Sequence, residues 1–186
     1  MRAKKITKSK NSDNSSIAKK LLNPMKEVRI EKVILSAGAT SEDLKKAKKL
    51  LELLTNGKAQ ILSSNKRIPD FDVSPGLEVG TRITLRGKKA IDLLRRLLGA
   101  IDNKLNKKQI SENHFSFGIR EYIEIPGIEY QRDIGIRGFN TTVVFSRKGR
   151  KVIIKKIKSG RLPKKQHISK EEIIKYMEAV FKTQIT

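Results

Sequence analysis

Several residue types and patterns are missing from this sequence. The chain has no cysteine, which excludes disulfides, thiolate catalysis and cysteine-ligated zinc and fits a reducing compartment. No apolar run approaches the ~20 residues of a membrane helix. The basic N-terminus is not followed by the apolar segment of a signal peptide. We therefore expect a soluble protein that has no membrane partner.

Catalytic signatures are also missing. The chain has two histidines, His114 and His167, and no metal-binding or nucleotide-binding motif. The acidic pairs at 42–43 and 171–172 fall in the first turn of predicted helices, where the helix dipole and capping account for them. Asp70 and Asp72 remain without an assigned role. We expect no enzymatic activity, no cofactor and no metal.

The sequence has a large excess of positive charge. Lys and Arg number 42 against 19 Asp and Glu, which gives a formal net charge of +23. Self-repulsion of this size destabilises a compact chain, and a polyanion such as nucleic acid relieves it. Aromatic residues make up only 5% and tryptophan is absent. The composition therefore favours folded RNA, bound through its shape, phosphates and ribose hydroxyls, over stacking on single strands.

The positive charge is densest between residues 147 and 165. This stretch has ten Lys or Arg and no acid: Arg147, Lys148, Arg150, Lys151, Lys155, Lys156, Lys158, Arg161, Lys164 and Lys165. Val152, Ile153, Ile154 and Ile157 lie among them. The pattern predicts a basic strand over 151–157 followed by a loop, suited to a phosphate backbone. Two other functions stay open: an RNA-modifying or RNA-processing enzyme, and a DNA-binding architectural protein.

Hydrophobic periodicity predicts a single α+β domain over 23–186, preceded by a disordered basic arm over 1–22. Strands are expected at 28–35, 58–62, 81–86, 119–125, 141–146 and 151–157. Helices are expected at 41–54, at 87–105 and after the capping box formed by Ser169 and Glu172. Residues 63–80 form a long loop. The sheet is mainly antiparallel, with helices on one face and Arg82, Thr84 and Arg86 on the other, open face.

Five short segments carry a resemblance to a known family. Residues 23–33, 82–87, 115–121, 133–138 and 167–172 read NPMKEVRIEKV, RITLRG, FSFGIRE, DIGIRG and HISKEE. In this order they resemble the large-subunit ribosomal protein family that is numbered five in bacteria and eleven in eukaryotes. The first and last segments resemble archaeal or eukaryotic members. The resemblance covers about residues 23–182.

This resemblance implies a structural protein of the cytoplasmic ribosome. Family members lie in the central protuberance of the large subunit, where they bind 5S ribosomal RNA and large-subunit ribosomal RNA. A loop contacts tRNA in the peptidyl site. The expected partners are these RNAs and neighbouring ribosomal proteins, and no homo-oligomer is expected.

The resemblance also implies particular contact residues. Ribosomal RNA contacts are expected at Ser36, Gly57, Lys58, Arg82, Thr84, Arg86, Arg147, Lys148, Arg150, Lys151, Lys155 and Lys156. Thr84 matches the family residue, whereas Ser36 stands where Asn is usual and Gly57 where Gln is usual. The tRNA-facing loop corresponds to 63–80, with contacts expected at Lys66, Arg67, Phe71 and Gly76. In that loop Ser74 replaces the family's Arg.

Overall fold

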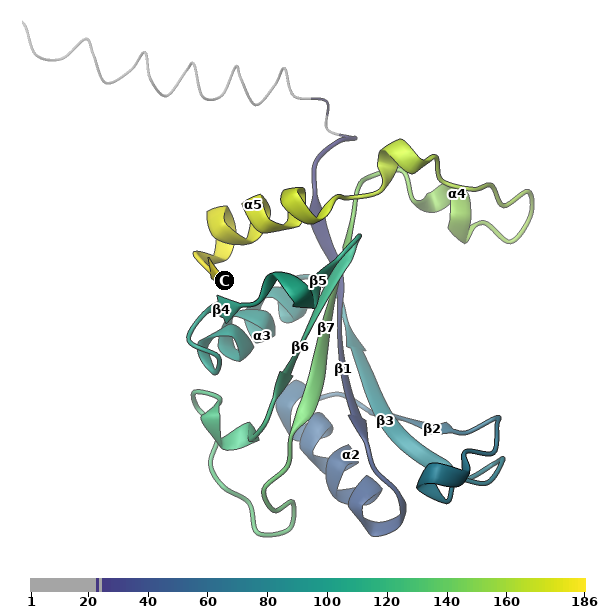
Figure 1. The fold of residues 1–186 in the computed structure, drawn as a ribbon, viewed down its shortest axis with the longest axis vertical. Helices are drawn as coiled ribbons and strands as arrows, with labels where there is room; N and C mark the ends of the chain where they lie inside the picture. The colour runs from purple at the N-terminus through teal and green to yellow at the C-terminus, as the bar shows by residue number, and fades with distance from the viewer. Residues whose placement is uncertain (1–22, 24) are drawn as a thin grey trace, which may run out of the picture.

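The architecture is an antiparallel sheet with helices packed against it (Figure 1). The computed structural model describes residues 23 and 25–186, so the arm expected at 1–22 lies outside the described residues. Six strands form the main sheet in the order β2-β3-β1-β7-β6-β5, and β4 and β8 form a separate parallel pair. The strands are β1 (Arg29–Gly38), β2 (Gln60–Ser63), β3 (Glu78–Leu85), β4 (Lys104–Leu105), β5 (Ile110–Ser111), β6 (His114–Ile119), β7 (Phe139–Ser146) and β8 (Gln184–Ile185).

The helices begin and end where local chemistry favours it. They are α2 (Ser41–Thr55), α3 (Lys88–Gly99), α4 (Lys151–Ile154) and α5 (Lys170–Phe181), with short 3-10 helices η1 (Pro69–Phe71), η2 (Lys107–Gln109), η3 (Tyr122–Glu124) and η4 (Lys164–Gln166). Asn56 ends α2 in the left-handed conformation at φ 50°. The predicted capping box at α5 is confirmed, because Ser169 Oγ accepts from the Glu172 N–H and the Glu172 carboxylate accepts from the Ser169 N–H.

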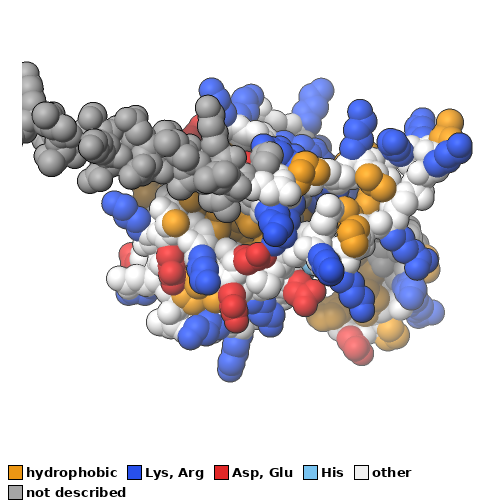
Figure 2. Space-filling view, turned by 90° about the horizontal axis from the view of Figure 1, so that it is seen from above, with side chains coloured by type: hydrophobic (Ala, Val, Ile, Leu, Met, Phe, Trp, Pro, Cys, Tyr) orange, Lys and Arg blue, Asp and Glu red, His pale blue; other side chains and the backbone are white. Residues whose placement is uncertain are grey.

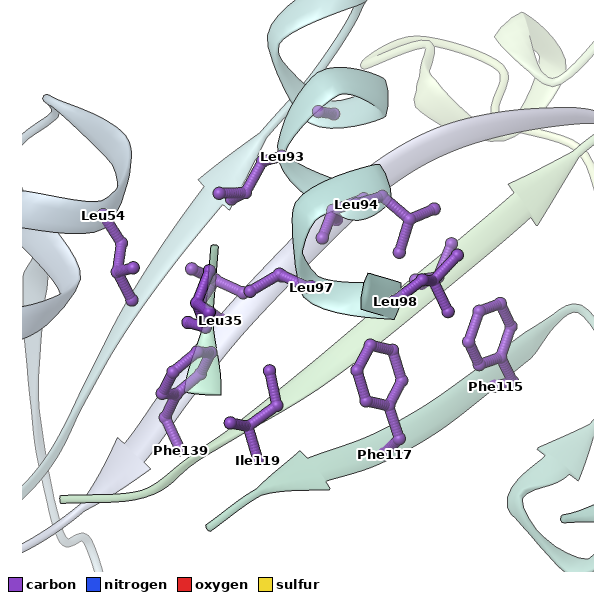
Figure 3. Packing of buried hydrophobic residues seen from close by; sticks show 14 of the residues in the cluster. Leu35, Leu54, Leu93, Leu94, Leu97, Leu98, Phe115, Phe117, Ile119 and Phe139 are labelled. Carbon is purple, nitrogen blue, oxygen red and sulfur yellow. The ribbon is translucent and has the colours of Figure 1, made fainter. Parts of the chain in front are cut away.

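The core lies between one face of the sheet and the helices. Every second residue of β1, namely Val33, Leu35 and Ala37, is buried against the leucines of α2 and α3. Side chains of α3 meet the aromatic rings of β6 (Figure 3). The rings of Phe115 and Phe117 stack with centroids 5.9 Å apart. The expected α+β class, with helices on one sheet face, is confirmed.

Two of the strand predictions were wrong. Residues 119–125 are not a strand, because β6 ends at Ile119 and the chain turns into η3 before Pro126. Residues 151–157 are not a strand either, because β7 already pairs with β1 on one side and β6 on the other. That basic segment instead forms the four-residue helix α4 and a loop.

Two element boundaries also differ from the prediction. The second helix ends at Gly99 rather than at 105, because the chain turns through Asp102 and Asn103, both at positive φ, so that Leu105 reaches the core from β4. The loop predicted at 63–80 is shorter, since Ser63 belongs to β2 and Glu78 begins β3. Among the described residues, no helix is long and apolar enough to cross a membrane.

Candidate nucleic-acid interface

The sheet face opposite the helices carries a row of polar side chains. Strand register places Gln60 opposite Arg82, Arg82 opposite Ser36, Ser36 opposite Asn140, and Asn140 opposite Gly118. Directly paired residues of an antiparallel sheet project from the same face. This row therefore crosses the sheet from β2 to β6 with amide, guanidinium and hydroxyl groups that donate and accept hydrogen bonds.

A second row runs beside the first. Thr84 pairs with Ile34, Ile34 with Thr142, and Thr142 with Ser116. The next pairing along the strands sets Lys32 opposite Val144 and Val144 opposite His114. No member of these rows is acidic, so the open face presents hydroxyl and amide groups bordered by cations. That chemistry suits a polyanion whose sugars and bases also form hydrogen bonds.

A shallow hollow lies in the middle of the open face. It is lined in part by Ser36, Gly118, Arg120 and Asn140. A Cβ atom at Gly118 would lie 3.1 Å from Asn140 Oδ1, which is closer than side chains normally approach. Glycine at this point keeps the amide of Asn140 accessible from the hollow.

The structure brings together three of the residues predicted for this face, Ser36, Arg82 and Thr84. Arg82 and Thr84 are exposed, whereas Ile83 between them is buried, which confirms the expected alternation. Arg86 is exposed just beyond the end of β3. Gly57 is placed differently, because a Cβ atom there would lie 3.1 Å from Ile83 Cδ1 on the core side. Lys58 is exposed next to it, before β2 begins.

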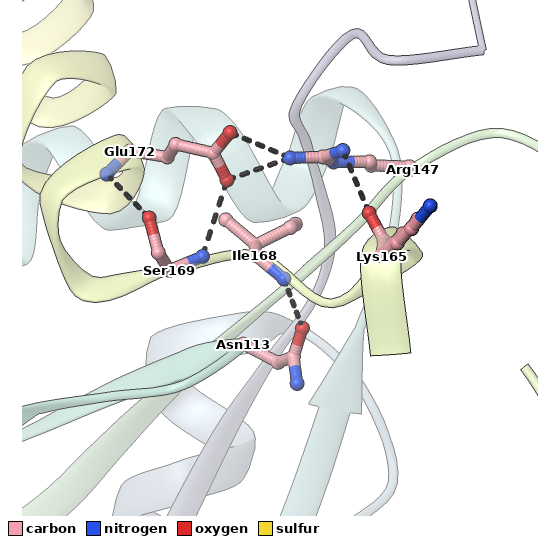
Figure 4. Close-up of polar contacts among 6 residues, drawn as sticks. All are labelled: Asn113, Arg147, Lys165, Ile168, Ser169 and Glu172. Atoms are coloured by element: carbon pink, nitrogen blue, oxygen red, sulfur yellow. Dashed lines mark hydrogen bonds and ion pairs between the residues drawn. The ribbon is translucent and has the colours of Figure 1, made fainter. Parts of the chain in front are cut away.

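The first part of the basic segment is tied to the rest of the domain by ion pairs. Arg147 Nη2 donates to both carboxylate oxygens of Glu172 at 2.6 Å (Figure 4). The Lys148 ammonium lies 3.3 Å from the carboxylate of Glu27, and Arg150 pairs with Glu31. Three of the predicted RNA-contact residues, Arg147, Lys148 and Arg150, therefore have acidic partners within the protein.

The rest of the basic segment faces outward. Lys151, Lys155 and Lys156 are exposed, and no ion pair to them is found within residues 23 and 25–186. Figure 2 looks onto the end of the molecule that carries α4 and α5, and Lys and Arg outnumber acids on this surface. This segment follows β7, so the cations lie at one end of the open face.

The loop predicted to face tRNA lies at the other end of β1 (Figure 1). At roughly 3.3 Å per residue, the strand separates the two ends by about 30 Å. Within the loop, Ile68 and Val73 form an antiparallel bridge around η1, and Val73 is buried. Phe71 is 76% exposed. The exposed residues also include the predicted contacts Lys66, Arg67 and Gly76, the last at φ 89°.

Asn113 fastens the basic segment to the sheet. Its side-chain oxygen accepts from the Ile168 N–H at 2.8 Å, and its amide nitrogen lies 3.0 Å from His167 Nδ1 (Figure 4). Burial, with a further contribution from the Glu27 carboxylate, raises the pKa of the Tyr176 phenol. Tyr176 therefore stays neutral at pH 7 and packs edge-on against Phe145.

Sequence reasoning missed half of the open face. The missed members are Lys32, Gln60, Ser116, Gly118, Asn140 and Thr142. A signal was present in 114–119, where Phe115, Phe117 and Ile119 alternate with small polar residues and glycine. That alternation indicates a half-buried strand whose polar residues share one face.

Comparison with known proteins identifies the family. Residues 78–176 match the model of the C-terminus of the ribosomal protein uL5 family. The chain is 36% identical over 160 residues to large ribosomal subunit protein uL5 of Archaeoglobus fulgidus, covering 85% of this chain and 90% of that protein. The chain belongs to the uL5 family. Two further uL5 proteins agree: that of Nanoarchaeum equitans is 37% identical over 88% of this chain and 98% of its own length, and that of Picrophilus torridus is 39% identical over 88% and 95%.

These uL5 relatives are archaeal, which confirms the archaeal character expected from the first and last motifs. They cover nearly the whole described domain, including the open face, the loop at 64–77 and the basic segment. A role as a structural ribosomal protein rather than an enzyme agrees with the family.

Proposed function

We propose that this uL5 protein holds 5S ribosomal RNA on the open face of its sheet as part of the large ribosomal subunit. The observation that supports this proposal most is the acid-free row from Gln60 to Gly118, in which Arg82, Ser36 and Asn140 lie side by side. A flat surface that offers hydrogen-bonding groups at fixed strand spacing can recognise the ribose hydroxyls and base edges of a folded RNA.

The two ends of β1 suit two further contacts. The exposed lysines of the basic segment carry no sequence information of their own and fit the phosphates of large-subunit RNA. The bridged loop with Lys66, Arg67 and the exposed Phe71 fits a second RNA, which we propose to be peptidyl-site tRNA. The separation of about 30 Å along β1 lets both contacts form at the same time.

The test is a comparison of affinities for the purified protein at ~0.15 M salt, where non-specific Kd values typically lie near 10⁻⁴ to 10⁻⁶ M. The ligands are 5S RNA, a length-matched structured RNA and a DNA duplex of equal charge. We expect 5S RNA to bind at least about a hundredfold more tightly than either control.

A matched variant separates the open face from general charge. Lys49→Ala removes an exposed cation from α2, which packs on the opposite face of the sheet, and should leave the preference unchanged. Equal affinity of the wild-type protein for 5S RNA and the control RNA would contradict the proposal. A preference for the DNA duplex would favour an architectural DNA-binding protein instead.

A further inference from the structure

The helix α4 and the turn after it carry exposed aliphatic side chains that phosphate binding does not explain. Val152, Ile153, Ile154 and Ile157 are 45%, 43%, 69% and 80% exposed. Residues 151–162, which we term the α4 protrusion, extend away from the sheet (Figure 1). Contiguous apolar surface on a protein is typical of an interaction site.

The α4 protrusion has a defined shape at its base. Arg147 and Arg150, just before it, are held by Glu172 and Glu31. The returning chain is fastened to the helix because the Gly160 N–H donates to the Val152 carbonyl at 3.1 Å. A Cβ atom at Gly160 would lie 2.9 Å from Val152 Cγ1, so glycine permits this close approach. The apolar side chains therefore project from a folded turn.

A groove lies between the α4 protrusion and the end of β7. Its volume is about 330 Å³, and Val144, Ile153 and Leu162 supply apolar lining. Arg147, Arg150 and Arg161 lie on its walls. Around it the segment 151–165 adds cations and no acid. The groove can take an aliphatic side chain while its walls attract carboxylates.

We infer that the α4 protrusion binds an acidic protein segment whose aliphatic side chains pack against Ile153, Ile154 and Ile157. Charge excludes a second copy of this chain, because its formal net charge is +23. RNA satisfies the lysines but offers little apolar surface to the isoleucines. A protein segment with interleaved carboxylates and Leu, Ile or Val complements both properties of the surface.

The test uses the full-length protein incorporated into ribosomal particles, and it rests on the proposed ribosomal role only for where the partner is sought. A benzoylphenylalanine photo-cross-linker replaces Ile153 in the groove and, in a control protein, Val180, a 47% exposed residue of α5. After irradiation, nuclease and protease digestion assign each adduct to RNA or to protein. Mass spectrometry then gives the sequence of the cross-linked peptide.

We expect the cross-linker at position 153, but not at 180, to give a protein adduct whose peptide contains acidic and aliphatic residues. In an Ile154→Ser/Ile157→Ser background the adduct yield should fall about tenfold, since truncated apolar anchors typically cost that much affinity. Adducts to RNA alone, to a peptide without acidic residues, or none would overturn the inference.

Failure of this inference can be told apart from failure of the proposed function. The purified Ile154→Ser/Ile157→Ser protein should bind 5S RNA within twofold of wild type, about 0.4 kcal/mol at most. Wild-type 5S binding with no protein adduct at position 153 would reject only the acidic partner.

Discussion

The open face and the basic segment at 147–165 both suit RNA, but they achieve it differently. On the open face the groups are mainly uncharged, and strand pairing sets the spacing of Ser36, Arg82 and Asn140. In the basic segment the groups are cations on a short helix and loops, and three of them already pair with acids. Fixed hydrogen-bonding groups discriminate between RNAs, whereas mobile cations add affinity that salt removes. We therefore expect specificity to depend on the open face.

The largest effect is expected from Thr84→Arg. The new side chain stands in the second row of the open face, where a closely fitted RNA has no room for it, although its charge should strengthen non-specific binding. Affinity for 5S RNA should fall ten- to a hundredfold, about 1.4–2.7 kcal/mol, while affinity for a control RNA stays equal or rises. Titrations of both RNAs at the same salt concentration measure this, and a parallel loss for both would contradict the comparison.

The next effect concerns stability rather than RNA binding. Arg147→Ala leaves the half-exposed Glu172 carboxylate without its bidentate partner and removes a bond to the Lys165 carbonyl. We expect the free energy of unfolding to fall by about 1–2 kcal/mol, less than for a fully buried pair because solvent screens Glu172. Urea denaturation of Arg147→Ala and of the exposed control Lys155→Ala gives the contrast. Equal stability of both variants would show that Arg147 has no structural role.

A smaller change should separate sheet stability from RNA recognition. Thr141 is fully buried beneath the open face, and its hydroxyl has no hydrogen-bond partner among the described residues. Thr141→Val keeps the shape and removes the unsatisfied group, so unfolding should cost about 1 kcal/mol more. Denaturation and 5S titration should show a more stable protein with unchanged affinity. Altered RNA specificity would mean that the core side of β7 contributes to recognition.

The smallest effects are expected from single exposed lysines of the basic segment. Lys155→Ala and Lys156→Ala should each weaken binding to 5S RNA and to a control RNA by the same factor. The slope of log K against log salt should become shallower by about one unit at most per lysine. Binding measured at several salt concentrations checks this. A loss confined to 5S RNA would place specificity in the basic segment.

The strongest sequence signals predicted the sheet and the helices correctly. Strict alternation at 81–86 placed Arg82 and Thr84 on the open face, and the capping box at Ser169 marked the start of α5. The position of Asn140 beside Ser36 could not be predicted, because it depends on the order of strands far apart in the sequence. The family resemblance supplied only the contacts that matched its motifs.

The basic segment was predicted less well for a physical reason. A β-branched run such as Val152 to Ile154 is ambiguous when judged by periodicity alone. A strand there would have needed a free edge of β7, and both edges are occupied. The acids that pair with Arg147 and Arg150 come from α5 and β1, which the local sequence does not reveal.

The most direct test is a cryo-electron microscopy structure of the large-subunit particle that contains this protein. The account predicts 5S RNA across the open face, with ribose or base atoms within hydrogen-bonding distance of Ser36, Thr84 and Asn140. An open face turned to solvent or covered by protein, with RNA only along residues 151–165, would contradict it.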